Sequence, residues 1–456
     1  MRVSHGFSAE FDDPNLVSCG GLAPVLALAE RAGLHDLVAA RVRIEAEGGA
    51  NAGLKVPALV AGMVAGADSI DDMDLLRHGG MGRVFGGVRA PSTLGTFLRA
   101  FTFGHVRQLD AVASRLVANL ARHVPLLPGA GEVAYLDVDD TVRETHGYAK
   151  QGVGWGYSKV KGLNALIATV STPTSAPVIV ATRLRKGSTN SARGAARLVA
   201  DALVTARAAG ATGLVIARFD SAFYTRDVLA AVARARARFS VTARMNPSVR
   251  TAIAGIAEDA WTPIRYPNAV FDEEEGRWIS DAEVAEVGFT AFTSRPKAEH
   301  VTARLIVRRV KRLNPAAAAQ GELFAAYRYH AVFTDSPLSM LDAESDHRGH
   351  AVIEQVNADL KGGALAHLPS GSFAANSAWL VCAAIAFNLT RAAGALASVF
   401  HAKATTATIR TQLITVPTRV ARSARRLVLH LPRDWPWEHA WKQLCDRSLH
   451  APPEPA

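Results

Sequence analysis

Apolar and polar positions follow two different rhythms along the chain, and the change falls near residue 130. Before it, apolar residues recur with helical spacing. In the stretch 91–101, Leu94, Phe97, Leu98 and Phe101 follow an i, i+3, i+4, i+7 pattern. We therefore predict an all-helical N-terminal domain over 1–130, which suits DNA binding and equally suits a plain helical packing module.

After residue 130 the apolar runs are short and strand-like, with one helical stretch at 191–210. The strand-like runs are 132–139, 162–172, 176–184 and 212–219. Strands that alternate with helices indicate an α/β core. We predict the first part of this core over 131–245 and its second part over 329–400.

The remaining segments have a different texture. Residues 246–328 are irregular and contain an acidic run at 272–275 and a basic strand-like run at 303–312, which predicts a β-rich insertion. Residues 401–456 form a basic C-terminal region. The most apolar run, 377–387, is too short to cross a bilayer and predicts a buried helix, so we expect no membrane association.

Charge and cysteine content narrow the class of partner. The 456 residues carry a formal net charge of +10, which favours a polyanion such as nucleic acid. Cys19, Cys382 and Cys445 are far apart and odd in number, so we expect neither a disulfide framework nor a cysteine-based zinc site. The N-terminus lacks the apolar core of a signal peptide, and a reducing cytoplasm is the expected compartment.

The first candidate site is an apolar strand that runs into three aspartates. In the sequence LDVDDT, Asp137 and Asp139 share one face of the predicted strand, and Asp140 points the other way. Paired carboxylates at a strand end are suited to Mg²⁺, which prefers oxygen ligands. A solvated strand end followed by a turn is the alternative.

Two chemistries fit this strand end. The pattern D-x-D-x-T resembles the haloacid dehalogenase superfamily of phosphatases, in which Asp137 would be the nucleophile and Asp139 the general acid and base. That superfamily usually begins with this strand, whereas about 130 residues precede it here. The other chemistry is a nuclease or strand transferase of the ribonuclease H type, which requires two further carboxylates on later elements.

Two such carboxylates are present. Asp220 ends the apolar run 212–219, and Glu354 lies within a predicted helix that closes at Gly362 and Gly363. At about 100° per residue, His347, His350, Glu354 and Lys361 share one face of that helix, which suits phosphate handling. A solvated charged face, and a local zinc site of His347, His350 and Glu354, are the alternatives.

Other residues fit contacts with nucleic acid. Lys159 and Lys161 share one face of an extended segment, and Arg185, Lys186 and Arg193 lie beside polar donors, so both groups suit the DNA backbone. Solvated loops are the alternative. Two tryptophans in the insertion suit base stacking, although a core position is commoner: Trp261 and Trp278.

Taken together, the motifs LDVDDT, RFDSAFY, the helix around Glu354 and SGSFAANSAWLVCAAIAFNLTR resemble the DDE transposases of bacterial insertion sequences. The resemblance covers roughly 10–430. It is closest to the thirteen-eighty family, which is related to the group with a Tyr-Arg-Glu-Lys helix. The chain departs from that group because His347 and His350 occupy its Tyr and Arg positions.

The resemblance implies a ribonuclease H-like core and cut-and-paste transposition. Asp139, Asp220 and Glu354 would hold two Mg²⁺ ions, with Mn²⁺ as a substitute and Asp137 as an assisting ligand, and Lys361 would hold phosphate. One ion would activate water and later a DNA 3′-OH, and the other would stabilise the leaving oxygen. The implied partners are double-stranded DNA, as terminal inverted repeats and as target, and a second copy of the chain on paired ends. The implied location is the bacterial nucleoid in the cytoplasm. A catalytically inactive DNA-binding relic is the remaining alternative.

Overall fold

The protein is described by a computed structural model, which covers 5–6, 8–145, 150–156, 159–266, 270–274, 277–279, 281–311, 327–424 and 426–450. The chain divides into two compact units, each built from separate stretches of sequence. One unit contains 127–144 and 152–358, and the other contains 1–126, 145–151 and 359–456. The predicted α/β class is confirmed by a mixed sheet flanked by helices. The predicted domain boundaries remain a prediction.

The unit formed by 127–144 and 152–358 is built on a ten-stranded sheet with the order β3-β4-β2-β6-β7-β13-β12-β11-β8, and β5 pairs with β4. The strands are β2 (Val133–Glu144), β3 (Gly154–Trp155), β4 (Lys161–Ser171), β5 (Val178–Lys186), β6 (Leu214–Phe219), β7 (Arg238–Thr242), β8 (Thr262–Pro263), β11 (Ala282–Ala291), β12 (Val301–Lys311) and β13 (Tyr327–Thr334). A separate hairpin contains β9 (Val270–Asp272) and β10 (Arg277–Ile279).

The middle of this sheet has a regular topology. β2, β4 and β5 are antiparallel neighbours, whereas β6 and β7 follow on the other side of β2 as parallel strands. Helices α7 (Ala195–Ala208) and α8 (Arg226–Arg234) connect β5 to β6 and β6 to β7. β2 and β4 are buried along most of their length, and apolar residues predominate at 133–138 of β2 and 163–170 of β4.

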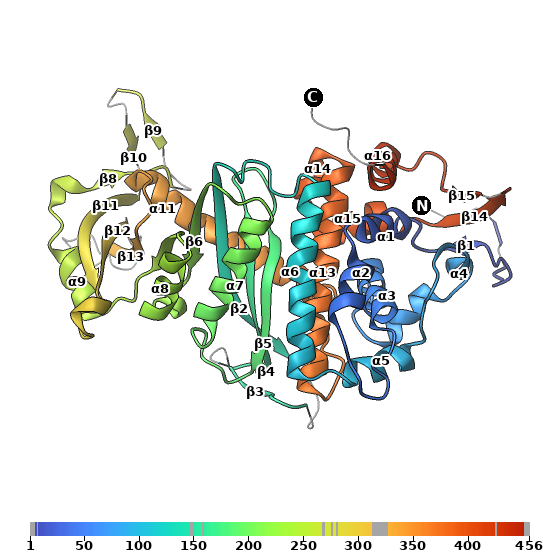
Figure 1. The fold of residues 1–456 in the computed structure, drawn as a ribbon. Helices are drawn as coiled ribbons and strands as arrows, with labels where there is room; N and C mark the ends of the chain where they lie inside the picture. The colour runs from blue at the N-terminus through green and yellow to red at the C-terminus, as the bar shows by residue number, and fades with distance from the viewer. Residues whose placement is uncertain are drawn as a thin grey trace. The chain divides into compact units, whose positions relative to one another are not determined.

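Helices cover both faces of the sheet. α7 and α8 lie on one face, and α11 (Met340–Arg348) lies on the other (Figure 1). A 3₁₀ turn, η5 (Gly349–Ala351), joins α11 to α12 (Val352–Lys361), and α9 (Pro247–Ala254) precedes the β8 strand. Sequence spacing predicted a single helix over this region. The 3₁₀ turn interrupts it, so a constant 100° step does not hold from His347 to Glu354.

The strands of the predicted insertion continue the central sheet. β13 pairs with β7, and β12 and β11 follow in antiparallel register. Ile264, Val284 and Ile306 form the buried core of this part, together with Ala343 from α11. The β-rich content predicted for 246–328 is therefore present in the described residues.

The other unit is mainly helical. Its helices are α1 (Leu22–Arg31), α2 (Leu34–Arg41), α3 (Ala52–Ala65), α4 (Met81–Val84), α5 (Pro91–Arg99), α6 (Phe103–His123), α13 (Phe373–Ala397), α14 (Val399–Lys403), α15 (Thr406–Ile409) and α16 (Glu438–Leu449). A small sheet joins β1 (Leu16–Val17), β14 (Thr418–Ser423) and β15 (Arg426–His430). The two ends of the sequence therefore contribute to the same unit.

Helix α13 forms the centre of this unit and contacts α3 and α6 (Figure 1). It has 25 residues and is therefore longer than the apolar run that the sequence analysis considered. By length and composition it would span a membrane, and it is the one such helix among the described residues. However, 94% of its most apolar window is buried inside the protein. That burial confirms the predicted buried helix.

Candidate active site

Asp139 and Asp220 lie side by side on neighbouring parallel strands. The register between β2 and β6 pairs Val138 with Phe219, and Asp139 and Asp220 each follow directly in the sequence. Asp220 follows the end of β6, and its Oδ1 accepts the backbone N–H of Ala222 at 2.9 Å. Strand pairing thus brings together two carboxylates that are 81 positions apart in sequence, and their role as metal ligands stays a prediction.

Both carboxylates are half-buried, and neither forms an ion pair with a described residue. Burial raises the pKa of Asp139 to about 6, and the nearby Asp220 carboxylate adds to the effect. Burial likewise raises the pKa of Asp220. Two partly desolvated carboxylates without a protein cation form a site that gains from a bound cation.

Asp139 is held by two donors. Its Oδ1 accepts the backbone N–H of Asp140 at 2.7 Å, and its Oδ2 accepts the Nδ2 of Asn357 at 2.9 Å. Asn357 belongs to α12, so this hydrogen bond ties that helix to β2. The sequence analysis missed Asn357, although its amide interrupts an apolar helix face of Ile353, Val356 and Leu360.

Glu354, the third predicted ligand, lies one helical turn before Asn357 and is exposed. Residues three apart on a helix are neighbours on its surface, about 5–6 Å between Cβ atoms. Among the described residues, no group of three His, Cys, Asp or Glu side chains is arranged to hold a metal ion. The pair of aspartates is therefore assembled, whereas the role of Glu354 remains a prediction.

Asp137 has a different environment from Asp139. It is fully buried, and its two oxygens accept Nε and Nη2 of Arg218 at 2.7 and 2.6 Å. Oδ1 is also 2.9 Å from Nδ1 of His350. Burial opposes ionisation, but Arg218 and His350 outweigh it and lower the pKa of Asp137.

These contacts give Asp137 a structural role. Its oxygens are occupied by Arg218 and His350 and closed to solvent. Asp137 therefore has no oxygen atom available to a metal ion, although we predicted it as an assisting ligand. The phosphatase alternative likewise has no exposed nucleophile, because a nucleophilic carboxylate must be reached by its substrate.

The two predicted phosphate-binding histidines point into the sheet. Nδ1 and Nε2 of His347 are each 2.9 Å from a hydroxyl of β7, Ser240 and Thr242 respectively. Burial lowers the pKa of His347 to about 3, so the ring is neutral at physiological pH. The prediction that His347 shares a phosphate-binding face with Glu354 is wrong, because the 3₁₀ turn rotates it toward β7.

His350 approaches the carboxylate pair from the same turn. Its Nδ1 is bound to Asp137, and the ring is close enough to influence the ionisation of both Asp139 and Asp220. The zinc alternative is not assembled, since His347 is held by two hydroxyls and His350 by Asp137. Lys361, at the end of α12, belongs to the other unit, and its contact with phosphate remains a prediction.

The predicted DNA contacts separate into exposed and buried side chains. The exposed residues are Lys159, Lys161, Lys186 and Arg193. Arg185 is buried instead, and its guanidinium donates to Asp140, to Asn164 and to the backbone carbonyls of 190, 191 and 193. The prediction that Arg185 contacts the DNA backbone is therefore wrong: it neutralises the buried Asp140.

The tryptophans also differ in their environments. Trp261 is half-buried, and the Arg309 guanidinium lies 4.3 Å from its ring centroid, so the ring has a protein partner. The side chain of Trp278 lies outside the described residues. A tryptophan that the sequence analysis passed over, Trp155, is 65% exposed and pairs with Lys161 across β3 and β4. An exposed tryptophan next to lysines is the signal that was missed.

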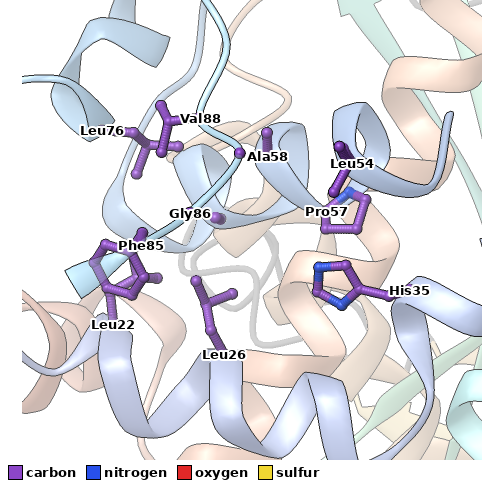
Figure 2. A pocket seen from close by; sticks show the side chains of 12 residues that line it. Leu22, Leu26, His35, Leu54, Pro57, Ala58, Leu76, Phe85, Gly86 and Val88 are labelled. Carbon is purple, nitrogen blue, oxygen red and sulfur yellow. The ribbon is translucent and has the colours of Figure 1, made fainter. Parts of the chain in front are cut away.

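A pocket in the helical unit has no comparable chemistry. It is apolar and is lined by residues of α1, α3 and the segment 85–88 (Figure 2). The imidazole of His35 lies beside the Pro57 ring in Figure 2. No carboxylate lines this pocket among the described residues, so it does not compete with the aspartate pair as the candidate active site.

Comparison with known proteins identifies the family of the chain. The family model described as "Transposase DDE domain group 1" matches residues 4–452, nearly the whole chain. Comparison with curated proteins gives no match.

Proposed function

The chain belongs to the DDE transposases, and from this premise we propose that it cuts and joins DNA at the Asp139–Asp220 pair. The observation that carries the proposal is the placement of these two carboxylates at adjacent parallel strand positions, without a cationic partner among the described residues. The strand order β5-β4-β2-β6-β7 supports a ribonuclease H-like core, because three antiparallel strands are followed by two parallel ones.

The donor set fits a divalent metal ion. Asp139 and Asp220 supply hard oxygen ligands, and Glu354 lies one turn from the residue that holds Asp139. Mg²⁺ is the proposed cofactor, and Mn²⁺ is expected to substitute. When bound, two such ions supply activation of the attacking oxygen and stabilisation of the leaving oxygen in phosphodiester hydrolysis and strand transfer.

Neighbouring residues of the protein orient Asp139 and neutralise Asp137. Asp140 and Asn357 fix the orientation of the Asp139 carboxylate. Arg218 neutralises Asp137 and also donates from Nη1 to the backbone carbonyl of Asp346 at 2.6 Å. The Asp137–Arg218 pair thereby connects β2 and β6 to the end of α11.

We assign DNA backbone contacts to Lys159, Lys161, Lys186 and Arg193, and base stacking to Trp155. Cross-strand pairing places Lys161 next to Trp155, and a lysine beside an exposed ring suits a phosphate next to an unstacked base. Double-stranded element ends and target DNA are the proposed substrates, and two copies of the chain are proposed to act on paired ends. Their site of action would be the bacterial nucleoid.

Cleavage of a plasmid that carries the gene with its native flanking DNA tests this proposal. We expect Mg²⁺-dependent cuts at the element boundaries with wild type and none with Glu354→Gln or Asp220→Asn. Asp227→Asn is the matched control, since Asp227 is an exposed carboxylate on α8 at the opposite face of the sheet. It should cut as wild type does.

Three other outcomes are informative. Cleavage by Glu354→Gln at the wild-type rate would remove Glu354 from the site. Binding of the plasmid without any cleavage by wild type would support a catalytically inactive relic. Hydrolysis of a small phosphate ester by wild type, without any cleavage of the plasmid, would favour the phosphatase instead.

A further inference from the structure

Asn357 is a buried polar residue that is only half satisfied. It is 7% exposed, and its Nδ2 donates to Asp139 as described above. Its Oδ1 is buried and has no hydrogen-bond partner in the described part of the chain. Because both amide atoms are bonded to one carbon, the unpaired oxygen lies beside the Asp139 carboxylate.

Packing alone does not explain an asparagine at this position. Ile353, Val356 and Leu360 make the rest of the buried face of α12 apolar. A buried amide oxygen without a partner costs free energy, and nearly all such groups in folded proteins are paired with protein or ordered water. An apolar side chain would avoid that cost but would lose the Nδ2 hydrogen bond to Asp139, so the amide at this position serves the Asp139 carboxylate and leaves an acceptor available.

The orientation of the amide is determined by its neighbour. A rotated amide would place Oδ1 against Oδ2 of Asp139, and two acceptors would then face each other. The donor therefore faces Asp139, and the acceptor occupies the other position of the same amide. This arrangement leaves a neutral hydrogen-bond acceptor next to a carboxylate that lacks a cation.

We propose that Asn357 is a positioning residue of the metal site. Its Nδ2 holds the Asp139 carboxylate, and its Oδ1 accepts a hydrogen bond from a water molecule on a divalent cation bound by Asp139 and Asp220. Mg²⁺ retains several of its waters in protein sites, and those waters need acceptors. An amide oxygen supplies one without adding a further negative charge to the carboxylate pair.

The same hydrogen bond positions Glu354. Asn357 fixes one turn of α12 against β2, and Glu354 lies on the preceding turn of that helix. Loss of the asparagine therefore affects the third carboxylate as well as the first. The inference rests on the proposed function, since it requires a cation at the aspartate pair.

Manganese binding by the full-length protein tests this role directly. The number and affinity of bound Mn²⁺ ions would be measured by electron paramagnetic resonance, in the absence of DNA. Partners that orient metal ligands typically contribute about 10–100-fold in metal affinity. We therefore expect Asn357→Leu to bind Mn²⁺ about 10–100-fold more weakly than wild type. If Asn357→Leu does not fold, Asn357→Ala removes the same two groups and should show the same loss.

Asn376 provides a matched control. It is a fully buried asparagine of α13 whose amide is satisfied on both sides: Oδ1 accepts from the backbone N–H of Ser370, and Nδ2 donates to the Ser370 carbonyl. Asn376→Leu should lower the stability to denaturant and leave the Mn²⁺ dissociation constant unchanged. Asn357→Leu should leave the stability without metal unchanged and should raise the Mn²⁺ dissociation constant.

The outcomes separate this inference from the proposed function. A folded Asn357→Leu or Asn357→Ala that binds Mn²⁺ with the wild-type constant overturns the inference, while cleavage by wild type leaves the proposed function intact. A wild type that neither binds Mn²⁺ nor cuts the plasmid overturns both.

Discussion

The guanidinium of Arg218 on β6 donates two parallel hydrogen bonds to the carboxylate of Asp137 on β2, at 2.7 and 2.6 Å, in a fully buried position. The two residues are direct Cα partners in the parallel register. Arg218 also lies 4.2 Å from the ring centroid of Tyr135, whose hydroxyl donates to Asp346. This ion pair therefore joins the two strands that carry the candidate active site to α11.

Breaking this ion pair should destabilise the protein strongly. Asp137→Asn leaves the Arg218 cation buried without a counter-charge, and removal of one partner of a buried pair typically costs about 3–5 kcal/mol. The free energy of unfolding would be measured by urea denaturation. The double variant Asp137→Leu/Arg218→Met should regain much of the loss. A stable Asp137→Asn protein would show that the pair is not a structural anchor.

Stability should fall in acid because of His347. Its pKa is lowered from 6.5 to about 3 by burial, so the unfolded state binds a proton between these values and the folded state does not. The contribution is fully present above about pH 6.5 and is lost as the pH falls toward 3, by about 1.4 kcal/mol per pH unit.

His347→Gln isolates this effect, because glutamine can still bond to a hydroxyl of Ser240 or Thr242 but does not titrate. The difference between the unfolding free energies of wild type and His347→Gln should change with pH between 6.5 and 4. His430→Gln, on the exposed strand β15, is the control. A pH-independent difference for His347→Gln would contradict the buried neutral ring.

Without metal, the Asp139 carboxylate should destabilise the fold at neutral pH. Its folded pKa of about 6 exceeds the ordinary 3.8, so its contribution to stability is present below pH 3.8 and lost as the pH rises through 6. Asp139→Asn should therefore raise the unfolding free energy in EDTA at pH 8, by on the order of 2 kcal/mol. Added Mg²⁺ should stabilise wild type and leave the variant unchanged. Equal stabilisation of both proteins would place the bound ion elsewhere.

Substitutions of neighbouring basic residues should affect different properties, DNA binding in one case and unfolding stability in the other. The double variant Lys186→Gln/Arg193→Gln removes two exposed charges, so DNA binding should weaken and the slope of log K against log salt should fall by about 0.9 per lost phosphate contact. Unfolding stability should not change. Arg185→Gln should instead lower stability, because Asp140 loses its buried cationic partner. A changed salt slope for a folded Arg185→Gln would refute that division.

Trp155 should contribute through its ring. Trp155→Ala is expected to weaken binding to DNA with unpaired ends by about 1–3 kcal/mol, which is the range for stacking of one base. Trp155→Phe should retain part of the affinity. Fluorescence anisotropy on duplexes with and without unpaired ends would measure the difference. Equal effects on both duplexes would indicate a contact other than stacking.

Local sequence was sufficient for the apolar strands that lead to the first two candidate carboxylates. The apolar runs around 133–138 and 214–219 end in Asp139 and Asp220, and the parallel register that pairs Val138 with Phe219 brings these ends together. The buried helix around 377–387 was equally evident, because a solvent-exposed helix would not be apolar on every side. The family resemblance relied on the same motifs, and the family match confirmed the DDE transposase assignment, whereas the thirteen-eighty family remains a prediction.

Only the tertiary structure decided what each polar residue does. Asp137 and Asp139 are two positions apart on one strand face, yet Arg218 neutralises the first and leaves the second without a cation. Arg185 and Lys186 are adjacent, yet one is buried with Asp140 and the other is exposed. His347 turned toward Ser240 and Thr242 because a 3₁₀ turn broke the helix. Spacing along a chain determines which residues can share a face. The partners that meet that face come from distant segments, and they determine its charge, its hydration and its chemistry.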